Sequence, residues 1–289
     1  MTASRGGVAQ SIQVRLVQHA KATGVDPNLV LTRYAVERFL YRLSRSQHAD
    51  RFVLKGAMLV LAWLGETLRP TRDADLLGLG DLSDDTLLEI IKQVCRVDVE
   101  PDAVIYDADT VGVEPIREEN AYGGWRVSVQ ASLGPAKMRV RLDVGIGDAV
   151  TPAAEWLDYP SLLGMPRPRL RAYARETVVA EKLHAMVLLG ARNSRMKDYF
   201  DVHALVREGA LDTRQLAAAI VSTFKRRETP LPAGVPTGLT DAFASDPDRQ
   251  ARWRAFLQKN RLLGPDLPQV VNEVRAYLDP VLAAITLRH

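Results

Sequence analysis

The chain has 289 residues, of which 47% are hydrophobic and 25% are charged, and its formal net charge is +3. This composition is typical of a globular protein with one large or two modest domains. The chain has no run of 18 apolar residues and a single cysteine, Cys95, which argues against a transmembrane helix, a disulfide framework and a thiolate zinc cluster.

The first predicted elements are helices, over residues 10–48. The residues before them lack the apolar core of a signal peptide, so we expect a cytoplasmic protein without a membrane partner. A strand over Phe52–Leu54 and a helix over Ala57–Leu64 follow, joined by Gly56. The next strand is predicted over Asp73–Leu79.

The middle of the chain is predicted to contain a helix and a hairpin. Ser83 is a suitable N-cap for the helix that follows it, which has acidic residues in its first turn. Between Gly124 and Gly147, polar and apolar residues alternate on both sides of the turn pair Gly134-Pro135, which indicates two antiparallel strands. The period of two places Asp143 on the polar face of the second strand.

The C-terminal part is predicted to be mostly helical. Helices are expected over Glu176–Leu189, from Met196 to near Gly209, and over Leu267–Ile285, the last as one of a final pair of helices. We therefore expect an α+β fold, in which a small mixed sheet is joined by N-terminal helices and a largely helical C-terminal domain. The predicted domains are residues 1–160 and 161–289.

Three aspartates form the candidate metal site. Asp73 and Asp75 leave the same face of their strand, and Asp143 lies on a later strand. Close carboxylates repel each other unless a cation lies between them, and an oxygen-only ligand set favours Mg²⁺ or Mn²⁺. Taken alone, the Asp-x-Asp pair is more often a polar strand edge than a metal site.

Gly56 favours the metal interpretation, because a glycine between a strand and a helix lets backbone N–H groups approach a phosphate. The order strand, Gly56, helix, Asp73 with Asp75, and later Asp143 is the minimal nucleotidyltransferase arrangement. The chain resembles the DNA polymerase β-like nucleotidyltransferases, and among them the AbiEii-type toxins of type IV toxin–antitoxin systems. The resemblance covers residues 52–208, through the segments VLKGAMLV, RPTRDADLL, VRLDVGIGD, ETVVAEKLHAM and RMKDYFDV.

The resemblance implies the roles of the remaining site residues. Lys55, Gly56 and Ala57 would bind the nucleotide; Ala57 stands where related enzymes often have serine, so phosphate contact there would depend on backbone N–H groups. Lys182 would bind the triphosphate, and Asp201 would position Lys182 or the acceptor. The cofactors would be Mg²⁺ or Mn²⁺ with an NTP substrate, and the partners a tRNA acceptor and an antitoxin protein.

Several alternatives stay open at this stage. Lys182 flanks an apolar stripe and needs a counter-charge, but a lysine there can also extend to solvent. Asp198 is a second candidate nucleotide ligand, although an acid in the first turn of a helix is also expected to face solvent. His184 and His203 lack a second metal ligand at suitable spacing and are expected to be core or surface histidines.

The charge of the chain is unevenly distributed. Residues 161–229 contain 13 Lys and Arg against 7 Asp and Glu, a net charge of +6, which leaves −3 for the rest. Such a basic segment suits an RNA partner. Candidate phosphate-backbone contacts cluster at Arg167, Arg169, Arg171, Arg192, Arg195, Lys225, Arg226 and Arg227. The segment RWRAFLQKNR (252–261) fits an RNA-contacting helix and a packing helix equally well.

The resemblance implies a toxin that transfers nucleotides to tRNA 3′ ends and blocks aminoacylation. The alternatives are an enzyme that modifies a protein or small molecule, and a regulator or antiphage module that binds nucleotide or RNA without turnover. Thr71 lies two residues before Asp73, and a phosphate on it would add nearly two negative charges beside the acids. We predict that this modification, or Thr71→Glu, blocks binding of the Mg²⁺–nucleotide.

Overall fold

The computed structural model describes residues 5–65, 71–116 and 123–287. By packing, the chain forms two units. The first comprises Met1–Ala62, Pro70–Gly147 and Trp156–Ala172, and the second comprises Trp63–Arg69, Asp148–Glu155 and Tyr173–His289. The division into domains at residue 160 stays a prediction.

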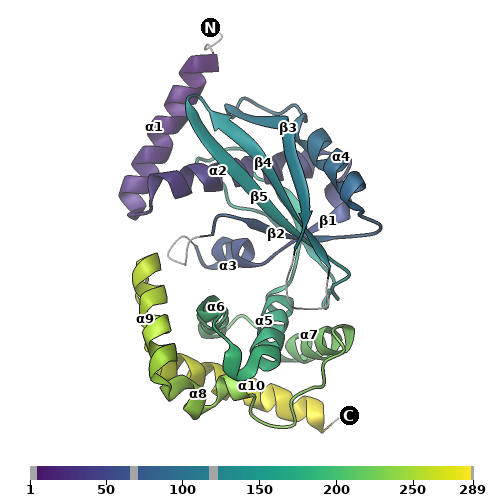
Figure 1. Ribbon diagram of the computed structural model, residues 1–289, viewed down its shortest axis with the longest axis vertical. Coiled ribbons are helices and arrows are strands. Elements are labelled where there is room, and N and C mark those ends of the chain that lie inside the picture. Colours follow the sequence, from purple (N-terminus) through teal and green to yellow (C-terminus); the bar gives the residue numbers. More distant parts are fainter. Residues whose placement is uncertain (1–4, 66–70, 117–122, 288–289) are drawn as a thin grey trace. The chain divides into compact units, whose positions relative to one another are not determined.

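One mixed sheet forms the centre of the first unit (Figure 1). Within the described residues its strand order is β3-β4-β5-β2-β1-β7-β6. β2 is antiparallel to β1 and parallel to β5, and β1 is also parallel to β7. The strands are β1 (Phe52–Lys55), β2 (Ala74–Gly78), β3 (Val104–Pro115), β4 (Gly124–Leu133), β5 (Ala136–Ile146), β6 (Glu155–Asp158) and β7 (Arg169–Ala172).

Helices α1 (Arg5–Thr23), α2 (Pro27–Arg45), α3 (Ala57–Leu64) and α4 (Asp84–Cys95) accompany this sheet. Asp26 caps α2 by accepting hydrogen bonds from the Asn28 and Leu29 N–H groups. α2 packs on β5, and α4 packs on β3. α3 connects β1 to the segment before β2, so the short strand β1 leads directly into a helix through Gly56.

The predicted hairpin and helix cap are confirmed. β4 and β5 pair in an antiparallel register that closes at Leu133 and Ala136, around Gly134-Pro135. Gly134 has a φ of 55°, as the first central position of a type II′ turn requires. The Ser83 hydroxyl accepts a hydrogen bond from the Thr86 N–H group. Strands β3, β6 and β7 were not among the predicted elements.

The second unit is helical apart from its connecting segments. Its larger helices are α5 (Arg175–Leu189), α6 (Met196–Glu208), α7 (Thr213–Arg226), α8 (Asp241–Ser245), α9 (Pro247–Asn260) and α10 (Leu267–Thr286). Short 3₁₀ turns are η1 (Ala49–Arg51) in the first unit and η2 (Gly190–Arg192) and η3 (Thr237–Leu239) in the second. The expected fold class, a mixed sheet with N-terminal helices and a helical C-terminal part, is confirmed. None of the helices within the described ranges has the length and apolarity needed to cross a membrane.

Candidate active site

A row of charged side chains crosses four neighbouring strands of the sheet. Asp75 on β2 pairs with Lys55 on β1 and with Asp143 on β5. Asp143 pairs in turn with Arg126 on β4. Because directly paired residues project from the same face of a sheet, Lys55, Asp75, Asp143 and Arg126 share one face.

Gly56 lies against the side chain of Asp75. Its φ is 71°, and a Cβ atom built on it would lie 2.0 Å from Asp75 Oδ2 and 2.6 Å from Asp75 Cγ. Both the backbone conformation and the lack of space therefore require glycine here. The turn from β1 into α3 thus lies so close to the Asp75 side chain that there is no room for a side chain at position 56.

Asp73 directly precedes β2, which begins one residue later than predicted, and it is near enough to Asp143 to be affected by its charge. Its pKa is raised, first because burial disfavours the charged form and then because Asp143 repels it. Arg141 and Arg126 oppose this effect. A carboxyl group made less acidic by burial and by a second carboxylate gains from a cation placed nearby.

The candidate ligands Asp73, Asp75 and Asp143 suit Mg²⁺ or Mn²⁺ chemically, because each offers carboxylate oxygens. Among the described residues, however, no three acidic, histidine or cysteine side chains are arranged as a ready-made metal site. Both oxygens of Asp143 are engaged by Arg126, at 2.8 Å from Nε to Oδ1 and 2.8 Å from the terminal nitrogen to Oδ2. Metal ligation by Asp73, Asp75 and Asp143 therefore stays a prediction.

The second unit contains a buried charge cluster between α5 and α6. Lys182 Nζ lies 2.7 Å from Asp198 Oδ1 and 2.8 Å from Asp201 Oδ2, and both aspartate side chains are 1% exposed. Arg195 Nε lies 2.7 Å from the other oxygen of Asp198. Lys182 is thus paired with the counter-charges that its place in the sequence predicted, and its side chain does not extend to solvent.

Asp198 differs from the solvent-facing expectation for a first-turn acid. It is buried beside Lys182, which brings a positive charge from the neighbouring helix. Burial by itself would raise the pKa of Asp198, but the attraction of Lys182 and Arg195 outweighs it, and the pKa is lowered. Asp198 is therefore a charged, fully enclosed partner of Lys182, on equal terms with Asp201.

Thr71 is half-buried, and its hydroxyl donates a hydrogen bond to the Asp73 carbonyl oxygen at 3.2 Å. It is thus held next to Asp73, as its chain position predicts. The preceding residues 66–70, with Arg69 of the RPTRDADLL segment, lie outside the described residues.

Arg227 is not available as a phosphate contact, contrary to the expectation for the basic cluster. Its guanidinium lies 3.1 Å from Asp148 Oδ1 and 3.2 Å from Glu181 Oε1 inside the second unit. It also lies 3.3 Å from His184 Nδ1, while His184 Nε2 lies 2.9 Å from the Thr229 hydroxyl oxygen. His184 is a buried core histidine and His203 is buried beside Glu273. Both fit the expectation of core or surface histidines.

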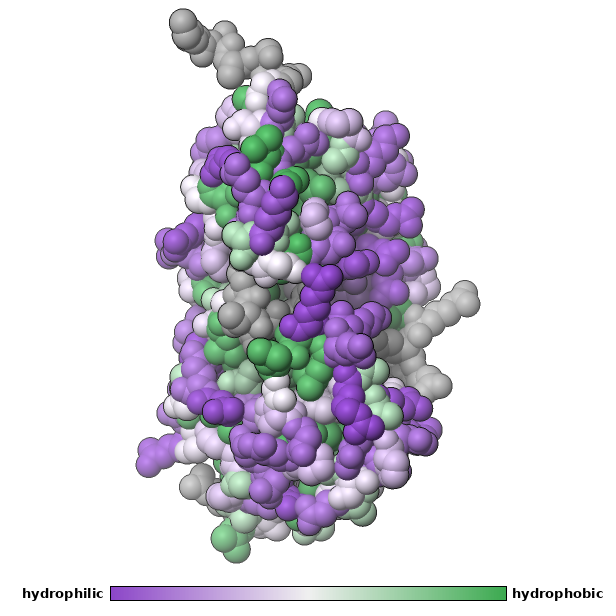
Figure 2. Space-filling model, turned by 90° about the vertical axis from the view of Figure 1, so that its left-hand side faces the viewer, coloured by the Kyte–Doolittle hydropathy of each residue, from purple (hydrophilic) through white to green (hydrophobic). Residues whose placement is uncertain are grey.

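Helix α9 is a packing helix with a basic exterior. Trp253 is 1% exposed and packs with Phe256 and Phe200, so this indole is not placed to stack on bases. Arg252, Arg254 and Lys259 are exposed. Figure 2 views the side on which α9 lies in Figure 1, and hydrophilic side chains predominate on that face.

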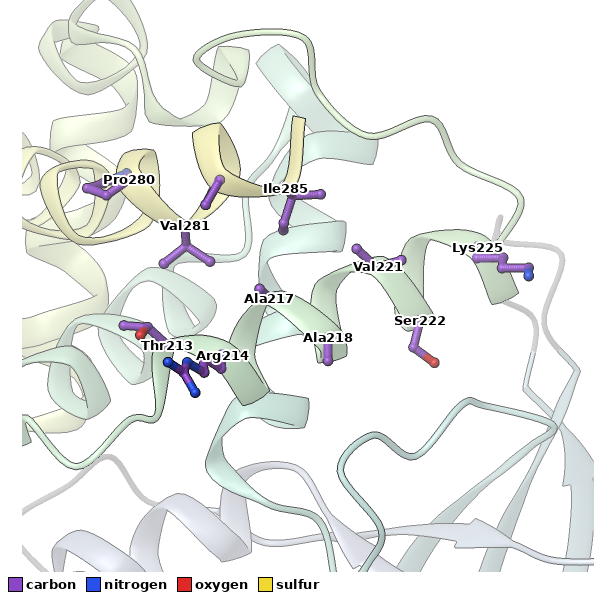
Figure 3. Close-up of a pocket in the computed structure, with 11 residues that line it drawn as sticks. Thr213, Arg214, Ala217, Ala218, Val221, Ser222, Lys225, Pro280, Val281 and Ile285 are labelled. Atoms are coloured by element: carbon purple, nitrogen blue, oxygen red, sulfur yellow. The ribbon is translucent and has the colours of Figure 1, made fainter. Parts of the chain in front are cut away.

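A separate groove of about 720 Å³ lies between α7 and α10 (Figure 3). Its walls include Ala217, Val221, Val281 and Ile285, with Arg214 and Lys225 toward its two ends. The lining contains no carboxylate. The groove therefore lacks carboxylate ligands for a hard cation such as Mg²⁺.

Arg126 is the residue of this face that the sequence interpretation missed. The signal was available, because the two-residue turn at Gly134-Pro135 makes the register of the hairpin calculable. Counting outward from the turn places Arg126 opposite Asp143, as observed.

Comparison with known proteins identifies the family and the fold of the chain. The family model of the nucleotidyl transferase AbiEii toxin of type IV toxin–antitoxin systems matches residues 38–280. A proposed nucleotidyltransferase from H. pylori has a similar fold, with a TM-score of 0.51 and 17% identity over 90% of this chain and 97% of its own. JHP933 from Helicobacter pylori has a TM-score of 0.50 and 16% identity over 88% and 92% of the two chains. No curated protein matches the chain.

Proposed function

The chain belongs to the family of AbiEii nucleotidyltransferase toxins of type IV toxin–antitoxin systems, and from this premise we propose the reaction it catalyses. It transfers NMP from an NTP to the 3′ end of tRNA in a Mg²⁺-dependent reaction and thereby blocks aminoacylation. The observation that carries this proposal is the pairing of Asp75 with Asp143 on parallel strands, with the Gly56 backbone against Asp75.

Each site residue has a proposed role. Asp73 and Asp75 would hold the metal, with Asp143 assisting, and Mn²⁺ would substitute for Mg²⁺ because the ligands are carboxylate oxygens. When bound, the metal would neutralise triphosphate charge and lower the pKa of the attacking hydroxyl group. Backbone N–H groups at Gly56 and Ala57 would contact phosphate, with Lys55 supplying positive charge beside Asp75.

Lys182 would bind the triphosphate, and Asp198 and Asp201 would position its ammonium group. Two carboxylates within 2.8 Å hold Lys182 in a fixed place, which suits a residue that must meet a phosphate with little reorganisation. Lysine serves this purpose as a compact point charge.

In the proposed reaction the 3′-hydroxyl oxygen of the acceptor forms a bond to the α-phosphorus of the NTP. The bond from that phosphorus to the bridging oxygen breaks, pyrophosphate leaves, and the hydroxyl proton passes to solvent. The protein contributes mainly by positioning the two reactants in line and by neutralising charge.

The proposal includes two macromolecular partners. The tRNA backbone would meet exposed cations such as Arg192, Lys225 and Arg226, through sequence-independent phosphate contacts. Membership of the toxin–antitoxin family implies an antitoxin partner. A cytoplasmic location belongs to the same proposal, because tRNA and NTPs are found there.

The test is incubation of the protein with each radiolabelled NTP, total tRNA and Mg²⁺, followed by separation of RNA, protein and small molecules. We expect label in tRNA, abolished by EDTA and by Asp73→Asn, and strongly reduced by Lys182→Ala. Lys21→Ala, which changes an exposed residue of α1, serves as a folding and handling control.

The other outcomes select the alternatives. Label in protein or in a small molecule would replace tRNA as the acceptor while keeping the transferase chemistry. Binding of nucleotide or RNA without label in any fraction, with Mg²⁺ and Mn²⁺ and all four NTPs, would indicate a non-catalytic binding protein.

A further inference from the structure

The inference concerns Arg126 and rests on the proposed role of Asp143 as a metal ligand. Arg126 holds both oxygens of Asp143 in a two-pronged pair, with both distances at 2.8 Å. This fork-to-fork geometry is the strongest way in which arginine engages a carboxylate. An Asp143 carboxylate held in this way has its oxygens directed at a guanidinium.

Arg126 is also placed where a cation is needed. The paired order across the sheet is Lys55, Asp75, Asp143 and Arg126, so the two adjacent acids are bordered by one base on each side. Like charges directly opposite each other on neighbouring strands are unfavourable. The guanidinium therefore compensates the repulsion between these acids in the absence of a metal ion.

The pair is accessible enough to open. The Arg126 side chain is 44% exposed and that of Asp143 is 25% exposed. Partly exposed ion pairs are weak because water solvates the separated groups well. A divalent cation with two charges is a stronger competitor for Asp143 than a single guanidinium.

We propose that Arg126 is a displaceable counter-ion, which holds Asp143 until a divalent cation replaces the guanidinium as the partner of this carboxylate. Arg126 is thus a positioning residue that sets the threshold for metal binding. It keeps the acid face neutralised without metal, at the cost of weaker metal affinity.

The experiment measures Mn²⁺ binding by the full chain, from the EPR signal of free Mn²⁺, without nucleotide or RNA. Arg126→Ala is expected to bind Mn²⁺ about tenfold more tightly, because the competing two-pronged pair is gone. Arg126→Lys is expected to fall between this variant and the wild type, since lysine retains the charge but lacks the fork.

Arg141→Ala is the matched control for charge alone. Arg141 acts on Asp73 at least as strongly as Arg126 does, yet it is paired across the sheet with Ser128 and not with Asp143. Removing it is expected to tighten Mn²⁺ binding by less than about threefold, because only the long-range repulsion between the guanidinium and the metal ion is lost.

A double-mutant cycle with Asp143→Asn identifies the partner of Arg126. The gain caused by Arg126→Ala should vanish when Asp143 is already asparagine. Equal gains in Arg126→Ala and Arg141→Ala, or a gain that persists in the Asp143→Asn background, would overturn the proposal.

The same series separates this inference from the proposed function. If Asp75→Asn leaves Mn²⁺ binding unchanged, the metal site itself is wrong, and the role of Arg126 falls with it. If Asp75→Asn abolishes binding while Arg126→Ala has no specific effect, the metal site stands and only the counter-ion role is refuted.

Discussion

At the scale of single residues, Gly56 shows how backbone conformation and chemistry are joined. A glycine is required there for two separable reasons, a φ of 71° and the 2.0 Å approach to Asp75 that any Cβ would make. The first reason is common to many turns. The second exists only because the turn touches a carboxylate of the candidate site.

Gly56→Ala is predicted to lose stability and activity together. Left-handed backbone costs a non-glycine residue about 1–2 kcal/mol, and the clash with Asp75 adds a further displacement of that side chain. A shift of about 1 Å in a reacting group is sufficient for a loss of about 100-fold in rate. Urea unfolding and the labelled-tRNA assay measure the two effects.

Gly24→Ala is the control for this prediction. Gly24 has a φ of 69° but no atom within 4 Å of a built Cβ. We expect it to lose stability by the backbone term alone and to retain transfer activity. If both variants lose activity equally, the contact between Gly56 and Asp75 has no special role.

At the scale of secondary structure elements, the buried charges between α5 and α6 contribute to stability as well as to the proposed site. Lys182→Met would leave the Asp198 and Asp201 carboxylates, each 1% exposed, without their main counter-charge. Removing one partner of a buried pair costs about 3–5 kcal/mol. Urea unfolding is expected to show a loss of this size.

Arg195 belongs to the same charge cluster and provides a comparison with Lys182. Arg195 also contacts Asp198, but its side chain is 39% exposed, so Arg195→Met is expected to cost only about 1 kcal/mol. Replacing Asp198 and Asp201 by asparagine in the Lys182→Met background should recover part of the stability, since fewer buried charges then lack partners. A loss from Arg195→Met as large as that from Lys182→Met would contradict this account.

The elements that were predictable from sequence are those whose signals are local. The hairpin around Gly134-Pro135 has long alternating strands and a turn that defines its register. β3 lacks such regularity, because its pairing with β4 shifts between Asp107 and Gly112. β6 and β7 have four residues each, too few for a period to be seen. β1 is equally short, but its apolar run and the glycine that follows it made it visible. The burial of Asp198 was also not predictable, because it depends on Lys182 of another helix.

In the candidate site, too, only the residues with a local sequence signal could be predicted. Asp73, Asp75 and Asp143 could be proposed from spacing and strand alternation, and the pKa of Asp73 is raised first by burial and then by the charge of Asp143. Arg126 required the register of two strands, and Arg227 required knowledge that Asp148 and Glu181 surround it. Charge on a sequence therefore indicates a polyanion partner only after the internally paired residues have been set aside.

At the scale of the whole molecule, stability is expected to depend on pH through His184. Arg227 can only donate, so its contact with Nδ1 requires an unprotonated nitrogen there. The proton then lies on Nε2, which donates to Thr229. His184 is thus held in its neutral form, with Arg227 on one side and Phe224 edge-on to the ring.

Burial and then the charge of Arg227 lower the pKa of His184 to about 4 from 6.5, and Asp148 offsets this only partly. Between these two pH values the unfolded chain binds a proton that the folded chain does not. The neutral His184 therefore contributes its full share to the free energy of unfolding above pH 6.5, and this share is lost as the pH falls toward 4. From pH 7 to pH 5 the loss amounts to about 2 kcal/mol.

His184→Gln is expected to remove this dependence, because glutamine can serve Thr229 and Arg227 without titrating. Urea unfolding at pH 7, 6 and 5 should show the difference between wild type and variant shrinking by about 2 kcal/mol toward acid pH. NMR of the imidazole should show the neutral form with the proton on Nε2 at pH 5. Stability curves that remain parallel over this range, or a ring already charged at pH 5, would mean that Arg227 tolerates an imidazolium and that the acid sensitivity of this protein has another origin.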